Sequence, residues 1–301
     1  MDKRAFLQLC AMGTLAAPVS ALMACAPKTA RDDTAQETGF ERMIRTRTIR
    51  ASYAPYAPAM MVDPNTKAMS GIFYEIMNLV GQYLGFKVEW TGEIGWGEIA
   101  DGLKAGKYDV CAANVWPTAA RATRGNFSMP AYFSAAFAFV RRNETRIASY
   151  ADINDPRVRI AVQDGDGIAD IARASFPRAQ IVAFPQMVDT KQRLRDVAAG
   201  KADVTFDDAH YAQLFIDANP GLVKRLATPK PLQVFANTMM FDSDDWRTKL
   251  MLDTAMSELH NSGAIERLIE KYTGRLDTFL PLARPYDSAT LHSFTPVLVA
   301  K

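Results

Sequence analysis

The sequence predicts an α/β protein built as two lobes, on three observations. Short apolar runs alternate with longer segments whose apolar residues recur at helical spacing, which favours a mostly parallel sheet covered by helices. The chain has 301 residues, 49% of them hydrophobic, so it can bury a large core, and this length favours two domains or lobes. The formal charge of +2 is near neutral and no basic run contains interleaved aromatics, so nucleic acid is not an expected partner.

The first 25 residues predict an export signal. Lys3 and Arg4 supply positive charge, and an apolar stretch over 6–23 follows. The motif Leu22-Met23-Ala24-Cys25 resembles a lipobox, so we expect Cys25 to carry lipid, and a plain secretory signal is the alternative. Lys3 stands where a twin-arginine signal has its first Arg, which leaves the export route open. Residues 26–40 are rich in Ala, Thr, Asp and Gln, and we expect them to form a flexible tether.

The first half of the mature chain alternates strands and helices. We predict strands over 48–53, 86–90 and 108–113, with helices over 71–85 and 96–105. Pro117 and Thr118 open a short helical turn, with Thr118 as a suitable N-cap, and this turn carries Arg121 beyond the carboxyl end of strand 108–113. Ligands of open α/β sheets lie there, and a guanidinium suits a carboxylate, although a solvated surface Arg is the simpler alternative.

The second half repeats this alternation. We expect strands over 136–140, 158–162, 202–206 and 234–240, and helices over 168–175, 192–199, 209–218, 245–262 and 263–272. The turn Gly165-Asp166-Gly167 precedes helix 168–175 and would present backbone N–H groups to an anion. Asp166 could equally be an ordinary N-cap. Residues 278–301 have no clear period, so we expect a tail on the surface.

The stretch from Ala105 to Phe133 resembles the family 3 extracellular solute-binding proteins, which are amino-acid receptors of bacterial ABC importers. The resemblance extends from about Thr48 to about Gly274. It implies the type II periplasmic-binding-protein fold, in which two crossing strands form a hinge between lobe 1 (41–137 with 238–277) and lobe 2 (138–237). The matching motif residues are Gly106, Lys107, Asp109, Thr118, Arg121, Phe127, Ser128, Pro130 and Tyr132.

The resemblance also implies a set of ligand-binding residues. Arg121 would pair with the ligand carboxylate, and Asp208 would hold its ammonium group, unless Asp208 is only the N-cap of helix 209–218. Trp116 and Asp166 depart from the family pattern, which often has Thr and a hydroxyl residue there; a cationic or zwitterionic ligand would suit Asp166. An aromatic wall and a glycine turn complete the set, from Tyr53, Tyr56, Trp96, Trp116, Gly165 and Gly167.

From these features we expect a periplasmic, lipid-anchored receptor, with no cofactor, that delivers an amino acid or amine with a positive or aromatic side group to an ABC permease. No motif for a nucleophile, metal or phosphate site emerges, so no catalytic residues are assigned. Cys111 is expected to be a buried free thiol, and His210, His260 and His292 to be surface residues. Two alternatives remain: a dehydratase resembling cyclohexadienyl dehydratases, and a receptor that serves a sensor or redox system.

Overall fold

The computed structural model describes residues 37–282. Several expected features therefore lie outside the described residues. These are the signal over 1–25 with Cys25, most of the tether, His292 and most of the tail. Within 37–282, no helix is both long and apolar enough to cross a bilayer.

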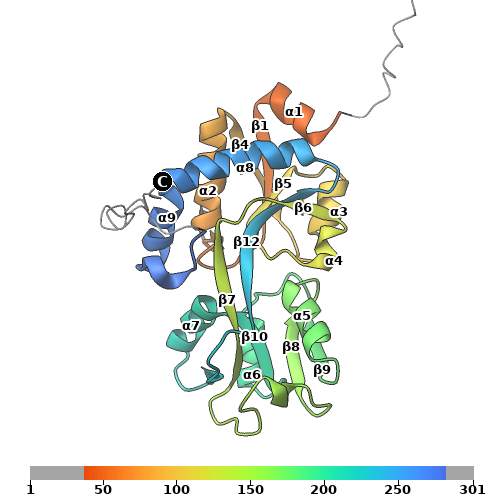
Figure 1. Cartoon of the computed structure of the whole chain (residues 1–301), viewed down its shortest axis with the longest axis vertical. Helices are drawn as coiled ribbons and strands as arrows, with labels where there is room; N and C mark the ends of the chain where they lie inside the picture. The colour runs from red at the N-terminus through yellow and green to blue at the C-terminus, as the bar shows by residue number, and fades with distance from the viewer. Residues whose placement is uncertain (1–36, 283–301) are drawn as a thin grey trace, which may run out of the picture. The chain divides into compact units, whose positions relative to one another are not determined.

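The α/β class and the two-lobed arrangement are confirmed (Figure 1). Strands follow the spatial order β4-β1-β5-β12-β7-β10-β8-β9, with β6 paired to β12 and β11 paired to β7. β1, β4 and β5 pair in parallel on one side of β12, and β8, β9 and β10 pair in parallel on the far side of β7. Each parallel group forms the sheet of one lobe.

The elements of the two lobes have the following bounds. Lobe 1 contains α1 (Gly39–Thr46), β1 (Thr48–Tyr53), β2 (Met61–Val62), β3 (Met69–Ser70), α2 (Ile72–Leu84), β4 (Lys87–Glu93), α3 (Ile99–Lys104), β5 (Val110–Val115), α4 (Ala119–Ala122), β6 (Gly125–Phe127), α8 (Trp246–Asn261), α9 (Ala264–Thr273) and a 3-10 turn (Leu276–Thr278). Lobe 2 contains a 3-10 turn (Ala151–Ile153), β8 (Arg159–Gln163), α5 (Gly167–Ser175), β9 (Gln180–Phe184), α6 (Gln192–Ala198), β10 (Val204–Asp208), α7 (Ala209–Ala218) and β11 (Val223–Arg225).

Two long strands, β7 (Tyr132–Arg141) and β12 (Gln233–Asp242), connect the lobes. They pair with each other in antiparallel fashion where 132–136 meets 233–237. Beyond that segment β7 pairs with β10 of lobe 2, whereas β12 pairs with β5 of lobe 1. Figure 1 shows these two strands running from one lobe to the other, which confirms the predicted crossing hinge strands.

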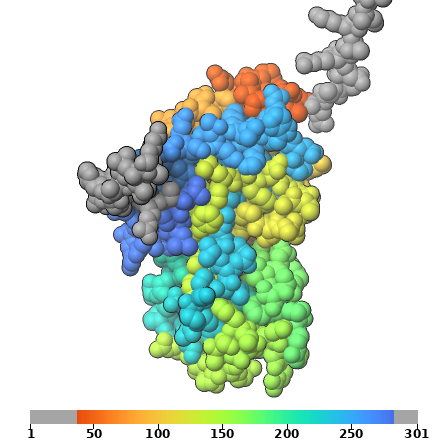
Figure 2. Space-filling view, viewed as in Figure 1, coloured from red at the N-terminus to blue at the C-terminus, as the bar shows by residue number. Residues whose placement is uncertain are grey.

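Each lobe has its own apolar core because its sheet and helices bury matching faces. In lobe 1, α2 presents Ile72, Ile76 and Val80 to the sheet, and all three are fully buried. Gly85 ends this helix in the left-handed conformation expected of a C-terminal glycine. Among the strands of lobe 2, Ile160 and Phe206 are buried. Figure 2 shows α8, in blue, on the outer surface of lobe 1.

Several expected boundaries differ from the structure. α3 begins at Ile99 rather than at Trp96, and the backbone N–H of Gly97, which precedes the helix, donates to Gln186 of lobe 2 (2.8 Å). α1 begins at Gly39, inside the range expected to be a tether, because Thr38 and Glu41 form a capping box. The strand predicted over 108–113 spans 110–115.

The chain after α9 also differs from the expected surface tail. Phe279 is buried and stacks on Tyr132 with ring centroids 4.3 Å apart, and the backbone of Leu280 pairs with that of Phe133. His210 and His260 are half-buried instead of lying on the surface. His260 contacts the carbonyl of Pro130 (2.9 Å), and burial lowers the pKa of His210. Cys111 is buried as expected and has no disulfide partner in the part of the chain that the structure describes, and burial raises its thiol pKa to about 12.

Candidate functional site

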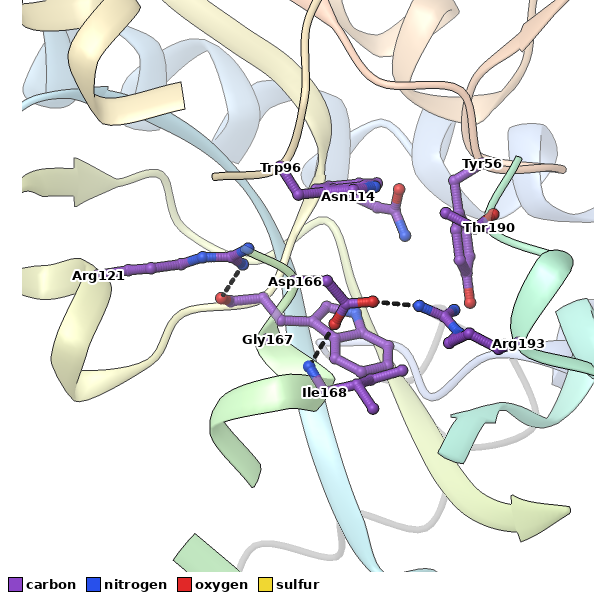
Figure 3. A pocket seen from close by; sticks show the side chains of 10 residues that line it. Tyr56, Trp96, Asn114, Arg121, Asp166, Gly167, Ile168, Thr190 and Arg193 are labelled. Carbon is purple, nitrogen blue, oxygen red and sulfur yellow. Dashed lines mark hydrogen bonds and ion pairs between the residues drawn. The ribbon is translucent and has the colours of Figure 1, made fainter. Parts of the chain in front are cut away.

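A cavity lies between the lobes, beside the hinge strands (Figure 3). Its volume of about 30 Å³ is far below the roughly 300–1,000 Å³ of typical ligand pockets. Hollows of about 230 and 250 Å³ adjoin it, and Trp96 lines all three spaces. A larger ligand therefore needs the lobes to separate before it can enter. The cavity is lined by Tyr56, Trp96, Asn114, Trp116 and Arg121 from lobe 1, and Asp166, Gly167, Ile168, Thr190 and Arg193 from lobe 2.

Arg121 extends from lobe 1 towards lobe 2. The Thr118 side chain accepts a hydrogen bond from the Arg121 backbone (3.2 Å), which fixes the short helix α4 beyond the end of β5. The guanidinium donates to two carbonyls, those of Trp116 (3.1 Å) and Gly165 (2.8 Å). None of the ion pairs within 37–282 includes Arg121. Burial lowers the Arg121 pKa, but an arginine stays charged in proteins, so this cation remains able to pair with an anion.

A buried charge network forms the opposite wall. Asp166 caps α5 by accepting from the backbone N–H of Ile168, and its second oxygen pairs with Arg193. Arg193 also donates to Asp207 (3.0 Å), and only 1% of its surface is exposed. Burial opposes the charge on Arg193, but Asp207 and Asp166 outweigh it and hold the Arg193 pKa above its usual value. In Figure 3, Arg193 points directly at Asp166.

Aromatic and amide side chains connect this wall to lobe 1. The Tyr56 hydroxyl donates to Asp207 (2.7 Å), and its ring stacks on Tyr211 with centroids 4.0 Å apart. Trp116 stacks on Phe235 of the hinge strand β12 (4.2 Å).

Two buried polar atoms of the cavity have no hydrogen-bond partner among the described residues: Asn114 Oδ1 and Arg193 Nε. The Asn114 amide nitrogen donates to Asn237 Oδ1 (3.4 Å), an oxygen that also accepts from Trp116 Nε1 (3.0 Å). This network orients the Asn114 side chain and leaves its oxygen unused. A buried acceptor without a partner is costly, so a ligand that donates a hydrogen bond here gains stabilisation.

The structure places six of the nine predicted site residues at the cavity and three outside its lining. Tyr53 lies outside the cavity and packs on Trp90 with centroids 6.1 Å apart. Asp208 also lies outside it and caps α7, accepting from the backbone N–H groups of His210 and Tyr211. Gly165 does not line the cavity, but its carbonyl holds Arg121. The predicted residues at the cavity are Tyr56, Trp96, Trp116, Arg121, Asp166 and Gly167.

Arg193, Asn114, Thr190 and Ile168 also line the cavity, and the sequence patterns did not identify them. For Arg193 the sequence does contain one indication of a buried role. Arg193 precedes Val197 by four residues and so lies on the same face of α6, and both side chains are buried. A charged residue in an apolar stripe indicates a buried ion pair, but the sequence does not name its partners, which are 27 and 14 residues away.

At Gly165 the backbones of the two lobes approach each other closely. Its φ is +74°, and a Cβ there would lie 2.3 Å from the Gly97 Cα of lobe 1. We predict that Gly165→Ala forces the lobes apart and breaks the Gly97 N–H bond to Gln186. Exchange of the Gly97 amide should accelerate about tenfold or more, measured by NMR.

The matched control for this substitution is Gly221→Ala. Gly221 has a φ of +86°, and a Cβ added there would meet no atom within 4 Å, so it carries the same backbone strain without the close approach. Unchanged exchange at Gly97 in the Gly165 variant would contradict the prediction.

The buried carboxyl of Asp208 leads us to predict that the free energy of unfolding depends on pH. Burial raises its pKa from 3.8 to about 7, with Asp207 adding to the shift. At a pH between the unfolded pKa of 3.8 and the folded pKa of about 7, Asp208 binds more protons in the folded state than in the unfolded state. The free energy of unfolding therefore falls as the pH rises from about 4 to 7. Asp208→Asn keeps the N-cap and should remove this component, on the order of 4 kcal/mol. Urea unfolding at pH 4 and pH 7.5 measures it, and an equal change in stability with pH for both proteins would refute it.

Comparison with known proteins gives a family match over most of the chain. Residues 49–275 match the model of bacterial extracellular solute-binding proteins, family 3. Among curated proteins, membrane-bound lytic murein transglycosylase F of Salmonella paratyphi B is 27% identical over 219 residues, which cover 69% of this chain and 40% of the relative. The Serratia proteamaculans protein of the same name is also 27% identical, over 70% of this chain and 43% of its own length. The chain thus spans less than half of these relatives.

Solved structures agree on the fold. The ancestral amino acid-binding protein AncCDT-1, described as a precursor of cyclohexadienyl dehydratase, superposes with a TM-score of 0.67 at 22% identity, covering 77% of this chain and 98% of its own. An amino acid ABC transporter substrate-binding protein of Streptococcus pneumoniae, bound to L-arginine, gives 0.67 at 18% identity, covering 78% and 98%. Identities this low establish the two-lobed fold alone.

Proposed function

The chain belongs to the bacterial extracellular solute-binding proteins of family 3, and we propose that it captures an amino acid or a related amine between its lobes and delivers it to an ABC importer. One observation carries this proposal. Arg121 is a charged group at the junction of the lobes that, among residues 37–282, is held only by carbonyl oxygens. A ligand carboxylate that replaced these carbonyls between the lobes would form a bidentate, charge-assisted pair with Arg121. Such a pair is stronger than hydrogen bonds to neutral carbonyls.

The mechanism follows from the position of this group. A carboxylate bound to Arg121 also lies beside the N-terminus of α5 in lobe 2, where Gly167 lines the cavity. A ligand that contacts both lobes favours the closed state by its greater affinity for it. β7 and β12 are the strands about which such a closure would turn.

The remaining parts of the proposal rest on family membership and on the N-terminal motif. A periplasmic location and an ABC permease as partner suit a family 3 receptor. The Cys25 lipobox would keep the receptor at the membrane. We also propose a binding protein rather than an enzyme, because the acid at the cavity, Asp166, is occupied by Arg193 and a backbone N–H and is poorly placed to transfer a proton.

The dehydratase alternative is testable by turnover, since such an enzyme would consume prephenate or arogenate. The neighbour described as a dehydratase precursor is itself an amino acid-binding protein. Product formation measured by absorbance, abolished by Arg121→Ala, would replace the receptor proposal.

A thermal-shift screen tests the receptor proposal. The purified chain is heated with amino acids, polyamines, quaternary amines and aromatic carboxylates, each at a concentration far above a micromolar dissociation constant. A ligand at 100-fold its dissociation constant adds about 2.7 kcal/mol of stability and an easily measured rise in melting temperature. A rise with at least one amino acid supports the proposal. A rise with no amino acid, but with an amine that lacks a carboxylate, excludes the role given to Arg121.

A further inference from the structure

The acidic groups of the cavity wall are already matched by a cation of the chain itself. Each of the four carboxylate oxygens of Asp166 and Asp207 accepts a hydrogen bond. Arg193 supplies one bond to each carboxylate, and its guanidinium lies between them. All three side chains are more than nine-tenths buried, so water does not screen their charges. The wall therefore holds two negative charges and one compensating positive charge.

Arg121 provides the second positive charge, so the four groups together are electrically balanced. An amino acid bound as a zwitterion leaves this balance unchanged. A cationic side group would add an unmatched positive charge beside Arg121 and Arg193, in a space where like charges repel strongly. The unused acceptor of Asn114 can take an N–H or O–H group of the ligand without adding charge.

We propose that Arg193 makes the cleft selective for amino acids with uncharged side groups, by occupying the position between Asp166 and Asp207 that a cationic side group would otherwise take. This inference rests on the proposed receptor function and narrows its ligand class. Of the two classes considered from the sequence, positive and aromatic, it retains the uncharged aromatic one. Three acids line the neighbouring hollows. Glu93 and Asp189 are exposed, so water screens them, and the half-buried Asp170 pairs with Arg173 (3.8 Å).

The test uses ligand pairs that match in shape and differ in charge. Calorimetry on the purified full chain compares L-citrulline with L-arginine, and L-norleucine with L-lysine. We expect the uncharged member of a pair to bind at least about tenfold more tightly, or, if both pairs are too long for the cleft, a shorter uncharged or aromatic amino acid to bind while arginine and lysine do not. Arg193→Met frees Asp166 and Asp207, and should shift the arginine-to-citrulline ratio towards arginine by about tenfold or more.

Two further variants separate selectivity from folding. Arg195→Met makes the same change on α6, but Arg195 is half exposed and pairs with Asp189, so the ratio should stay at the wild-type value. Arg193→Lys keeps the charge and should keep the preference for uncharged ligands, even if Arg193→Met does not fold. Equal or tighter binding of arginine by the wild-type chain overturns the inference while leaving the receptor function intact. Binding of no amino acid at all removes the receptor function, and the inference with it.

Discussion

Replacing Arg193 with alanine should lower the free energy of unfolding by about 3–5 kcal/mol, because it leaves Asp166 and Asp207 buried without their shared cation. Burial already raises the pKa of Asp207, and Arg193 acts against that rise. Without Arg193 both carboxylates must take up protons or draw water into the wall. Urea unfolding monitored by tryptophan fluorescence measures the loss as a lower midpoint with an unchanged slope.

Arg195→Ala is the matched control for this prediction. Arg195 is two residues away on the same helix, and its ion pair with Asp189 (2.9 Å) is exposed on both sides. Exposed pairs contribute about 0–1 kcal/mol, so this variant should unfold almost as the wild type does. A loss below about 1 kcal/mol for Arg193→Ala would mean that the buried network does not stabilise the folded state.

Much of the fold could be predicted because local patterns and global packing agree. The 3.6-residue spacing of Ile72, Ile76 and Val80, followed by Gly85, specifies a helix and its end without reference to the rest of the chain. The start of α3 could not be predicted in this way. The segment just before the helix contacts the other lobe, where the Gly97 N–H donates to Gln186, a residue 89 positions away, and no local pattern encodes this contact.

The site residues also divide into those that a local pattern predicts and those whose contacts depend on long-range packing. Trp116 follows β5 directly and Arg121 lies on the next short helix, so the rule that ligands lie beyond the carboxyl ends of strands places both at the cavity. Asp166 and Asp208 each had two interpretations, and each serves as an N-cap in the structure. Only Asp166 also lines the cavity, because its second oxygen turns to Arg193. The contact between Asp166 and Arg193 depends on how α5 and α6 pack in lobe 2, which no local pattern encodes.

Substituting Arg121 with alanine should weaken binding of the ligand found by thermal shift by about 100-fold or more, or about 2.7 kcal/mol. The side chain is half-buried on a short exposed helix, and its partners are two carbonyls rather than acids. Its removal should therefore change the free energy of unfolding much less than the loss of Arg193 does. Calorimetry gives the affinity, and the melting temperature without ligand gives the stability.

Arg124→Ala distinguishes a specific contact from a general loss of positive charge at this edge. Arg124 lies one turn beyond Arg121, is half exposed, and pairs with Asp101 (2.5 Å); it lines a neighbouring hollow but not the cavity itself. Long-range attraction of the ligand carboxylate would fall similarly in both variants and would shrink with added salt. If the ligand carboxylate contacts Arg121 directly, only Arg121→Ala weakens binding, and this loss of affinity persists at high ionic strength. Equal weakening by the two substitutions would therefore move the carboxylate away from Arg121, whereas a loss confined to Arg121→Ala would place it there.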